Sequence, residues 1–253
     1  MFKTAIVRKP CEEMILGISS ASLGLPDFKL ALKQHDGYVE ALRSCGLEVT
    51  ILEPDSKFPD SCFVEDVALC TSRFAVLTNP GAPSRNGEKK EMAPVLNRFF
   101  SLVERIEAPG TLDAGDVMMV GDHFYIGRSE RTNEQGAAQL IDILQNHGKT
   151  GETVPLKEML HLKTGVSYIE NNRLLVYGEF CDHKAFTRFA KIEVEEAESY
   201  AANSLWINGT VLVPEGFSGT RAKIEDAGYP TIAVDVSEFR KLDGGLSCLS
   251  LRF

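Results

Sequence analysis

Apolar and polar positions alternate along the chain in a repeating order: a short apolar strand, a polar turn, then a second apolar strand. This order predicts β-hairpins, because strands carry apolar runs and the turns between them are polar. Four complete copies occur, over residues 63–81, 113–127, 165–178 and 203–214. The last contains Asn-Gly, the strongest short hairpin signal. A fifth copy would be split, with the C-terminal segment 247–253 pairing with the N-terminal segment 4–8.

The segments between the hairpins have apolar residues at helical spacing. The pattern is clearest over 28–44, where Asp27 is placed to cap the helix, and over 133–147. It is weaker over 91–100 and 221–227. Short apolar strands are expected after helices, over residues 48–52, 102–106 and 231–234.

Each hairpin with its helix forms a unit of roughly 40–50 residues that cannot bury its apolar faces alone. Closing five such units into a ring removes most exposed sheet edges, and pairing the two chain ends fastens the ring. We therefore expect an α/β fold with pseudo-fivefold ββαβ-type units, formed as one domain over residues 1–253 with no linker. The alternative is a doubly wound parallel sheet, but hairpins between helices argue against all-parallel order.

Charge and composition limit the function. The net charge is −9 and no Lys/Arg cluster exceeds a pair, which argues against nucleic-acid binding and suits a cationic substrate. No apolar stretch approaches the ~20 residues that cross a bilayer, and the N-terminus lacks a signal-peptide core. Six cysteines without C-x-x-C spacing indicate free thiols in a reducing cytoplasm, and no histidine lies at zinc-ligand spacing beside them.

Reactive residue types lie at or just before the start of each hairpin. The first unit offers Asp60, Glu65 and Asp66; later units offer Asp113 and Asp116, His161, and Cys248. In equivalent units these starts would converge at one end of the ring. Taken singly, Cys248 is more often an inert thiol, His161 a helix cap, and each aspartate a solvated turn residue. Together, they are typical of a cysteine nucleophile with a histidine partner.

The carboxylates narrow the expected substrate. Negative charge raises the pKa of a neighbouring thiol and so disfavours the thiolate, unless the substrate itself is cationic. A guanidinium or amidinium substrate is therefore expected. The alternation predicted for the strand 247–253 sets Cys248 opposite the apolar face of Leu249, Leu251 and Phe253.

Seven segments resemble one family in order along nearly the whole chain: 58–66 (FPDSCFVED), 79–85 (NPGAPSR), 111–117 (TLDAGDV), 129–133 (SERTN), 160–165 (LHLKTG), 200–203 (YAAN) and 241–251 (KLDGGLSCLSL). This resembles the dimethylarginine dimethylaminohydrolases, bacterial ones especially, of the amidinotransferase or pentein superfamily. The resemblance implies a five-bladed α/β propeller. It implies hydrolysis of mono- and asymmetric dimethylarginine to citrulline and methylamine or dimethylamine, through a covalent cysteine thiouronium, without metal or cofactor.

The resemblance also implies residue roles. Cys248 would attack the guanidinium carbon, His161 would act as acid and base, and Asp113 would orient His161. The implied substrate-binding residues are Asp66 on the guanidinium, Asp60, Phe63 and Glu65 on the same wall, Arg85 and Arg131 on the carboxylate, and the carbonyls of Ile18 and Leu242 on the α-amino group. Two features depart from the pattern or have no assigned place: Asn86 stands where relatives often carry arginine, and Arg128 adds a positive charge near Arg131.

Two rival functions stay open at this point. A sibling hydrolase would act on arginine, agmatine or citrulline, although arginine deiminases carry an extra helical module and agmatine has no carboxylate for Arg85 and Arg131. A non-catalytic propeller would bind cationic amino acids or a protein partner, but binding alone needs no thiol. The preferred methylation pattern and the oligomeric state are open, with a homodimer as one expectation.

Overall fold

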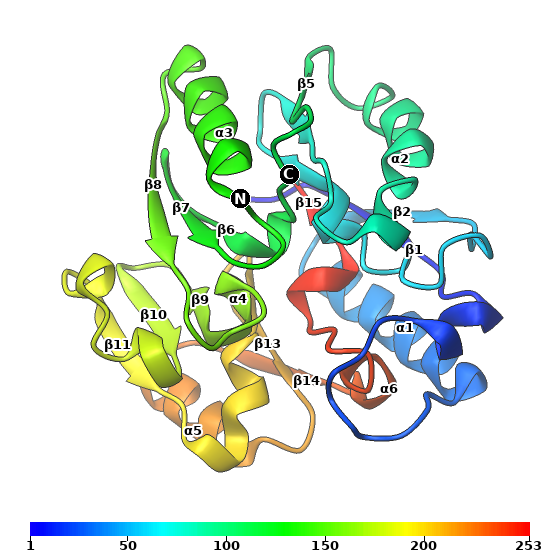
Figure 1. Cartoon of the computed structure of the whole chain (residues 1–253). Coiled ribbons are helices and arrows are strands. Elements are labelled where there is room, and N and C mark those ends of the chain that lie inside the picture. The colour runs from blue at the N-terminus through cyan, green and yellow to red at the C-terminus, as the bar shows by residue number, and fades with distance from the viewer.

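The computed structural model describes all 253 residues as an α/β fold with five separate three-stranded sheets (Figure 1). In four sheets two successive strands form an antiparallel hairpin, and in the fifth the hairpin partners are the two ends of the chain. The hairpin strands are β3 (Ala68–Cys70) with β4 (Ala75–Leu77), β6 (Val117–Val120) with β7 (His123–Arg128), β9 (Val166–Tyr168) with β10 (Arg173–Val176), β12 (Leu205–Ile207) with β13 (Thr210–Pro214), and β15 (Leu251–Arg252) with β1 (Thr4–Arg8).

A third strand completes each sheet by pairing in parallel with the second hairpin strand. These third strands are β2 (Glu48–Leu52), β5 (Val103–Arg105), β8 (Thr150–Pro155), β11 (Ala190–Glu193) and β14 (Thr231–Val234). The sequence pattern predicts β2, β5 and β14 but misses β8 and β11. Both missed strands are edge strands with mostly exposed or half-exposed residues, so they carry no apolar alternation.

Helices connect the hairpins to the third strands in four of the five sheets. They are α1 (Phe28–Ser44), α2 (Glu88–Leu96), α3 (Glu134–Asn146) and α5 (Ser218–Asp226), with the shorter α4 (Leu162–Gly165) and α6 (Ser237–Arg240) elsewhere in the chain. The bounds predicted for α1 are confirmed, and the Asp27 carboxylate accepts a hydrogen bond from the Leu30 N–H at 3.0 Å. No helix combines the length and the apolar character needed to cross a membrane.

Neighbouring sheets are joined by five hydrophobic clusters, each filling the space between two sheets. Between the β3-β4-β5 and β6-β7-β8 sheets, for example, Phe74 and Val76 share a cluster with Phe124 and Ile126. The other clusters continue this series from sheet to sheet and return to the sheet of the chain ends. Five interfaces for five sheets leave no open end, which explains why units with small cores are stable together.

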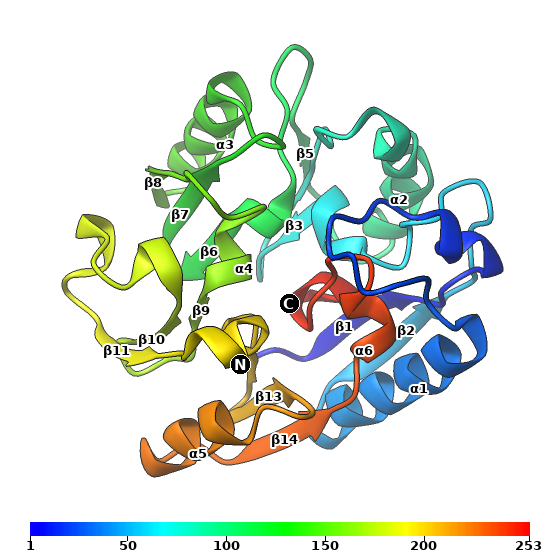
Figure 2. The same ribbon diagram turned by 60° about the horizontal axis from the view of Figure 1, so that its bottom comes forward.

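A short helical turn precedes the first strand of every hairpin, and these turns gather near the centre of the molecule (Figure 2). They are η2 (Val64–Val67), η4 (Ala114–Asp116), α4, η7 (Glu196–Ala202) and η8 (Ser247–Leu249). The strand predicted over 247–253 is therefore wrong in its first half. The Cys248 N–H donates to the Gly245 carbonyl at 3.1 Å, which closes a turn there, so strand alternation does not describe the position of Cys248.

Candidate active site

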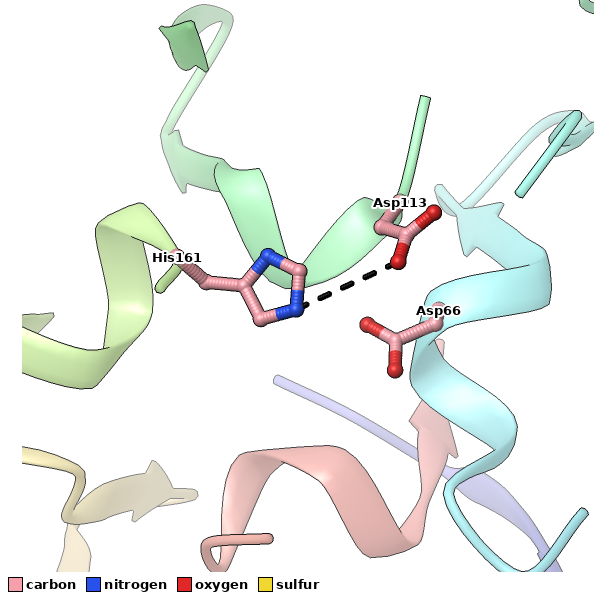
Figure 3. Close-up of side chains that lie close together, drawn as sticks. All are labelled: Asp66, Asp113 and His161. Carbon is pink, nitrogen blue, oxygen red and sulfur yellow. Dashed lines mark ion pairs between the residues drawn. The ribbon is translucent and has the colours of Figure 1, made fainter. Parts of the chain in front are cut away.

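Three of the predicted site residues meet where the central turns converge (Figure 3). Asp66 lies in η2, Asp113 immediately precedes η4, and His161 immediately precedes α4. The His161 Nε2 atom lies 4.0 Å from Asp113 Oδ2. Each of the three side chains offers one possible metal-ligand atom, and these atoms lie within 4.8 Å of one another. The cluster could therefore hold a metal ion as well as an organic cation.

Asp66 is a buried carboxylate that stays ionised. Its Oδ2 pairs with Arg85 Nη1 at 2.5 Å, and its Oδ1 accepts the Gly115 N–H at 3.2 Å. Burial alone would raise the pKa of Asp66, but the positive charges of Arg85 and His161 outweigh it and lower the pKa below the ordinary value. The site therefore keeps a permanent negative charge beside His161.

Asp113 is fully buried, at 0% exposure. Its Oδ1 accepts the Gly81 N–H at 2.7 Å, whereas its Oδ2 has no hydrogen-bond partner. Burial, followed by the charge of Asp66, raises the pKa of Asp113 to about 7 in spite of His161. A buried acceptor without a partner is costly, so Asp113 Oδ2 offers a place for a donor from a bound molecule.

His161 lies among three carboxylates. Burial lowers the pKa of His161, but Asp116, Asp66 and Asp113 outweigh it and raise the pKa to about 9. The imidazole is therefore protonated at neutral pH in the empty site. Asp116 is the nearest of the three, with Oδ2 3.3 Å from His161 Nδ1. The sequence offers Asp116 as a candidate beside Asp113 but gives it no role.

Cys248 is half-buried and lines a pocket of about 40 Å³ together with His161. Its Sγ accepts the Gly245 N–H at 3.4 Å. Burial first, then the charges of Asp66 and Glu65, raise the pKa of the Cys248 thiol to about 12. A larger cavity of about 490 Å³ shares Lys163 and Ser247 with this pocket, but neither Cys248 nor His161 lines it.

Asn203 holds the loop that carries the thiol, a role that sequence reasoning missed. Its Oδ1 accepts the Ser247 N–H at 3.0 Å, and its Nδ2 donates to the Lys163 carbonyl at 2.9 Å. Gly245 permits this close approach, because a Cβ there would lie 2.5 Å from Asn203 Cγ. In the sequence, Asn203 is marked only by its place at the end of the segment 200–203 and at the start of the hairpin 203–214.

Arg85 and Glu65 are committed to partners within the protein. Arg85 is 5% exposed; its Nε and Nη2 donate to both carboxylate oxygens of Glu88, at 2.9 and 2.8 Å, and its Nη1 donates to Asp66. Glu65 Oε1 pairs with Lys163 Nζ and with Arg252 Nη2, each at 2.7 Å. Arg85 therefore has few donors left for a substrate, and Glu65 lines the larger cavity.

The remaining predicted residues lie in three places. Asp60 and the segments around Ile18 and Leu242 lie together, because the Ile18 N–H donates to Asp60 Oδ1 at 3.0 Å and Ser19 Oγ donates to the Lys241 carbonyl at 2.6 Å. The Phe63 ring is 4% exposed in the core, where a Cβ on Gly244 would lie 2.1 Å from it. Arg131 is half-buried, and its side chain makes no ion pair.

Two minor positions are also placed. Arg128, at the end of β7, is exposed. Asn86 Nδ2 donates to Asn79 Oδ1 at 2.8 Å, so this side chain supports the turn that carries Arg85.

The chain is similar in sequence to proteins of one known family. The family model described as "N,N dimethylarginine dimethylhydrolase, eukaryotic" matches residues 27–181. The chain is 54% identical to an N(G),N(G)-dimethylarginine dimethylaminohydrolase of Pseudomonas aeruginosa, with 100% of both chains covered. It is 34% identical to a protein of the same name from Streptomyces coelicolor, over 99% of this chain and 96% of that one.

Solved structures give the same result. A cysteine-to-serine mutant of the Pseudomonas aeruginosa enzyme, complexed with citrulline, matches with a TM-score of 0.99 over 100% of both chains at 54% identity. The N-terminal domain of the arginine dihydrolase ArgZ matches in fold, with a TM-score of 0.88 at 19% identity over 99% of this chain and 97% of that one. The chain therefore belongs to the dimethylarginine dimethylaminohydrolase family.

Proposed function

We propose that the chain hydrolyses N-omega-methylated arginine, releasing citrulline and methylamine from monomethylarginine or dimethylamine from asymmetric dimethylarginine. One observation carries the proposal. Cys248 and His161 line one pocket, and the buried carboxylates of Asp66 and Asp113 lie beside His161. The family relationship supports it: the Pseudomonas aeruginosa enzyme was solved with citrulline, and one variant of a dimethylarginine dimethylaminohydrolase as an adduct with S-methyl-L-thiocitrulline.

The proposed chemistry has two steps. In the first, the Cys248 thiolate adds to the guanidinium carbon, the bond from that carbon to the methylated nitrogen breaks, and protonated His161 supplies the proton that lets the amine leave. In the second, neutral His161 takes a proton from water, and the hydroxide adds to the covalent thiouronium. The hydroxide oxygen becomes the ureido oxygen of citrulline, and the carbon–sulfur bond breaks to release Cys248.

The carboxylates would bind the cationic end of the substrate. Asp66 offers a permanent negative charge, and Asp113 Oδ2 offers an acceptor without a partner, so a guanidinium N–H could satisfy it. Neither side chain needs to move far, because both are already held by backbone N–H groups. A donor-rich cation placed between them fits the charge and the hydrogen-bonding needs of the pocket.

The far end of the substrate would meet a different set of groups. We assign the substrate carboxylate to Arg131 in the first place, because its guanidinium makes no ion pair. Arg85 donates to Glu88, to Asp66 and to the Phe63 carbonyl, so it would contribute only through its second Nη1 hydrogen. The carbonyls of Ile18 and Leu242 would accept the α-amino group, with Asp60 holding the Ile18 backbone. Glu65 and Phe63 would support this wall from behind.

We further infer that the five sheets form a five-bladed propeller closed into one domain by the strands of the two chain ends. The unbroken series of inter-sheet clusters supports this. All six cysteines are free thiols, which is compatible with the expected cytoplasmic location. A homodimer and the absence of nucleic-acid partners remain predictions, which sedimentation of the purified protein with and without duplex DNA would test.

A steady-state assay of citrulline release from asymmetric dimethylarginine, monomethylarginine and arginine tests the proposal. Both methylated substrates should be turned over, and the Cys248→Ser variant should release no citrulline under the same conditions. Faster turnover of arginine would assign the chain to a sibling activity. If none of the three were turned over and dimethylarginine bound tightly, the chain would be a non-catalytic binding protein.

A further inference from the structure

The Asp116 carboxylate is buried more deeply than any other acidic group near His161 except Asp113. It is 0% exposed and is held by three donors from within the protein. Ser129 Oγ and Thr132 Oγ1 both donate to Oδ2 at 2.6 Å, and the Leu162 N–H donates to Oδ1 at 2.9 Å. A carboxylate that accepts three hydrogen bonds is fixed in orientation.

This fixed carboxylate lies against one particular nitrogen of His161. Asp116 Oδ2 is 3.3 Å from Nδ1, whereas the nearest oxygen of Asp113 is 4.0 Å away and faces Nε2. Leu162 follows His161 directly in the chain, so Asp116 faces the ring and also accepts a hydrogen bond from the backbone next to it. Nδ1 is buried and makes no hydrogen bond of regular geometry, so Asp116 Oδ2, at 3.3 Å, is the carboxylate oxygen placed to accept its proton.

The chain also makes room for this arrangement. A Cβ on Gly127 would lie 2.9 Å from Asp116 Oδ1, so a larger residue in β7 would push the carboxylate away from its donors. Two other segments therefore converge on Asp116, which lies in η4: the end of β7 with the loop after it, and the start of α4. The surrounding chain therefore fixes the Asp116 carboxylate in one place and one orientation.

We propose that Asp116, and not Asp113, is the positioning residue of His161: it accepts the Nδ1–H, fixes that tautomer, and leaves Nε2 facing the substrate. The inference rests on the proposed function, in which His161 is the acid and base. With Nδ1–H bound to Asp116, neutral His161 keeps a lone pair on Nε2 to activate water, and protonated His161 presents an Nε2–H to the leaving amine. Asp113 is then free to bind the guanidinium through its unpartnered Oδ2.

Substitution of Asp116 by asparagine tests the assignment, because the amide has nearly the same shape but can offer N–H to Nδ1 and so favour the wrong tautomer. We expect kcat to fall by about a hundredfold or more with KM within roughly threefold of wild type, as for other histidines that lose an orienting carboxylate. Asp116→Glu, which keeps the acceptor, should recover part of kcat. Asp122→Asn is the matched control, since Asp122 is an exposed carboxylate that pairs with Lys149.

Two further measurements separate positioning from a merely structural role. Loss of the Asp116 charge should lower the pKa of His161, although Asp66 and Asp113 still face the ring. The alkaline limb of the kcat/KM pH profile, which reports deprotonation of His161, should therefore move to lower pH in Asp116→Asn. Asp113→Asn should instead raise KM more than it lowers kcat. An Asp116→Asn variant that folds and keeps wild-type kcat, or whose limb does not move, would overturn the assignment.

Nitrogen-15 NMR of histidine-labelled wild-type enzyme does not depend on any variant folding. Above the pKa of His161 the spectrum should show the Nδ1–H tautomer, and a predominant Nε2–H tautomer would refute the inference. This readout also separates the two proposals. If dimethylarginine were not hydrolysed, the proposed function would fail, while the tautomer measured in the free protein would still answer whether Asp116 positions His161.

Discussion

Substitution of Arg85 and of Arg131 by alanine should have different consequences, although the family resemblance gives both arginines the same role. Arg85 is 5% exposed and neutralises two buried carboxylates, Asp66 at 2.5 Å and Glu88 at 2.8 Å. Removing one partner of a buried ion pair typically costs about 3–5 kcal/mol, because the remaining charge stays buried without compensation. Arg131 is half-buried without an ion pair, so its loss should cost no more than about 0.5 kcal/mol of unfolding free energy.

Urea unfolding followed by the fluorescence of the single tryptophan, Trp206, measures this difference directly. Arg85→Ala should lower the unfolding free energy by several kcal/mol relative to Arg131→Ala at neutral pH. Arg128→Ala provides the matched control, because Arg128 is exposed at the end of β7 and should leave stability and turnover near wild type.

Activity should separate the same two variants. If Arg131 binds the substrate carboxylate, its loss removes a charge-assisted contact of about 1.5–3 kcal/mol, or roughly tenfold to a hundredfold in kcat/KM. The loss should vanish on a decarboxylated analogue. Arg85→Ala should lose activity on both substrates, since Asp66 loses its partner. An Arg85→Ala protein as stable as wild type, impaired only on the substrate with a carboxylate, would refute the reasoning.

Three other outcomes are expected. Cys248→Ser should abolish turnover while leaving the unfolding free energy within about 1 kcal/mol of wild type; retention of more than a few per cent of the rate would exclude Cys248 as nucleophile. Activity should survive exhaustive chelation, and a loss restored by zinc or manganese would show that the cluster of Asp66, Asp113 and His161 works with a metal. The rate of Cys248 alkylation against pH should give a thiol pKa well above its ordinary value in the free enzyme, and an inert guanidinium ligand should lower it; a value below 7, unchanged by the ligand, would indicate a standing thiolate–imidazolium pair.

The parts of the fold that could be predicted from the sequence are those with strong local signals. The helix α1 has apolar periodicity and an aspartate cap, and the hairpin β12–β13 has Asn-Gly at its turn. The strands β8 and β11 could not be predicted, because they are stabilised by parallel pairing with a distant neighbour and have few buried residues. The turn at Cys248 was missed for a related reason: it depends on the close approach of Asn203 to Gly245.

The site shows the same limit at the level of single atoms. The sequence places Asp113 and Asp116 correctly at the start of one hairpin, but it does not decide which of them meets His161. The two residues are three positions apart on a 3-10 turn, where side chains at i and i+3 lie on the same face. Spacing therefore fits either choice, and only the donors around Asp116, from segments 13 to 46 residues away, distinguish them.

The charges of the empty site explain why a guanidinium substrate suits it. Near neutral pH His161 is protonated, with a pKa of about 9, while the Cys248 thiol keeps its proton, with a pKa of about 12. The acid for the leaving amine is thus ready before the nucleophile is. Asp66 is the largest charged contributor to the high pKa of the thiol. A guanidinium bound to Asp66 would cancel that contribution and favour the thiolate at the moment when a carbon to attack is within reach. Neutral molecules of the same shape would bring no such charge, so the carboxylates that bind the substrate would also select it.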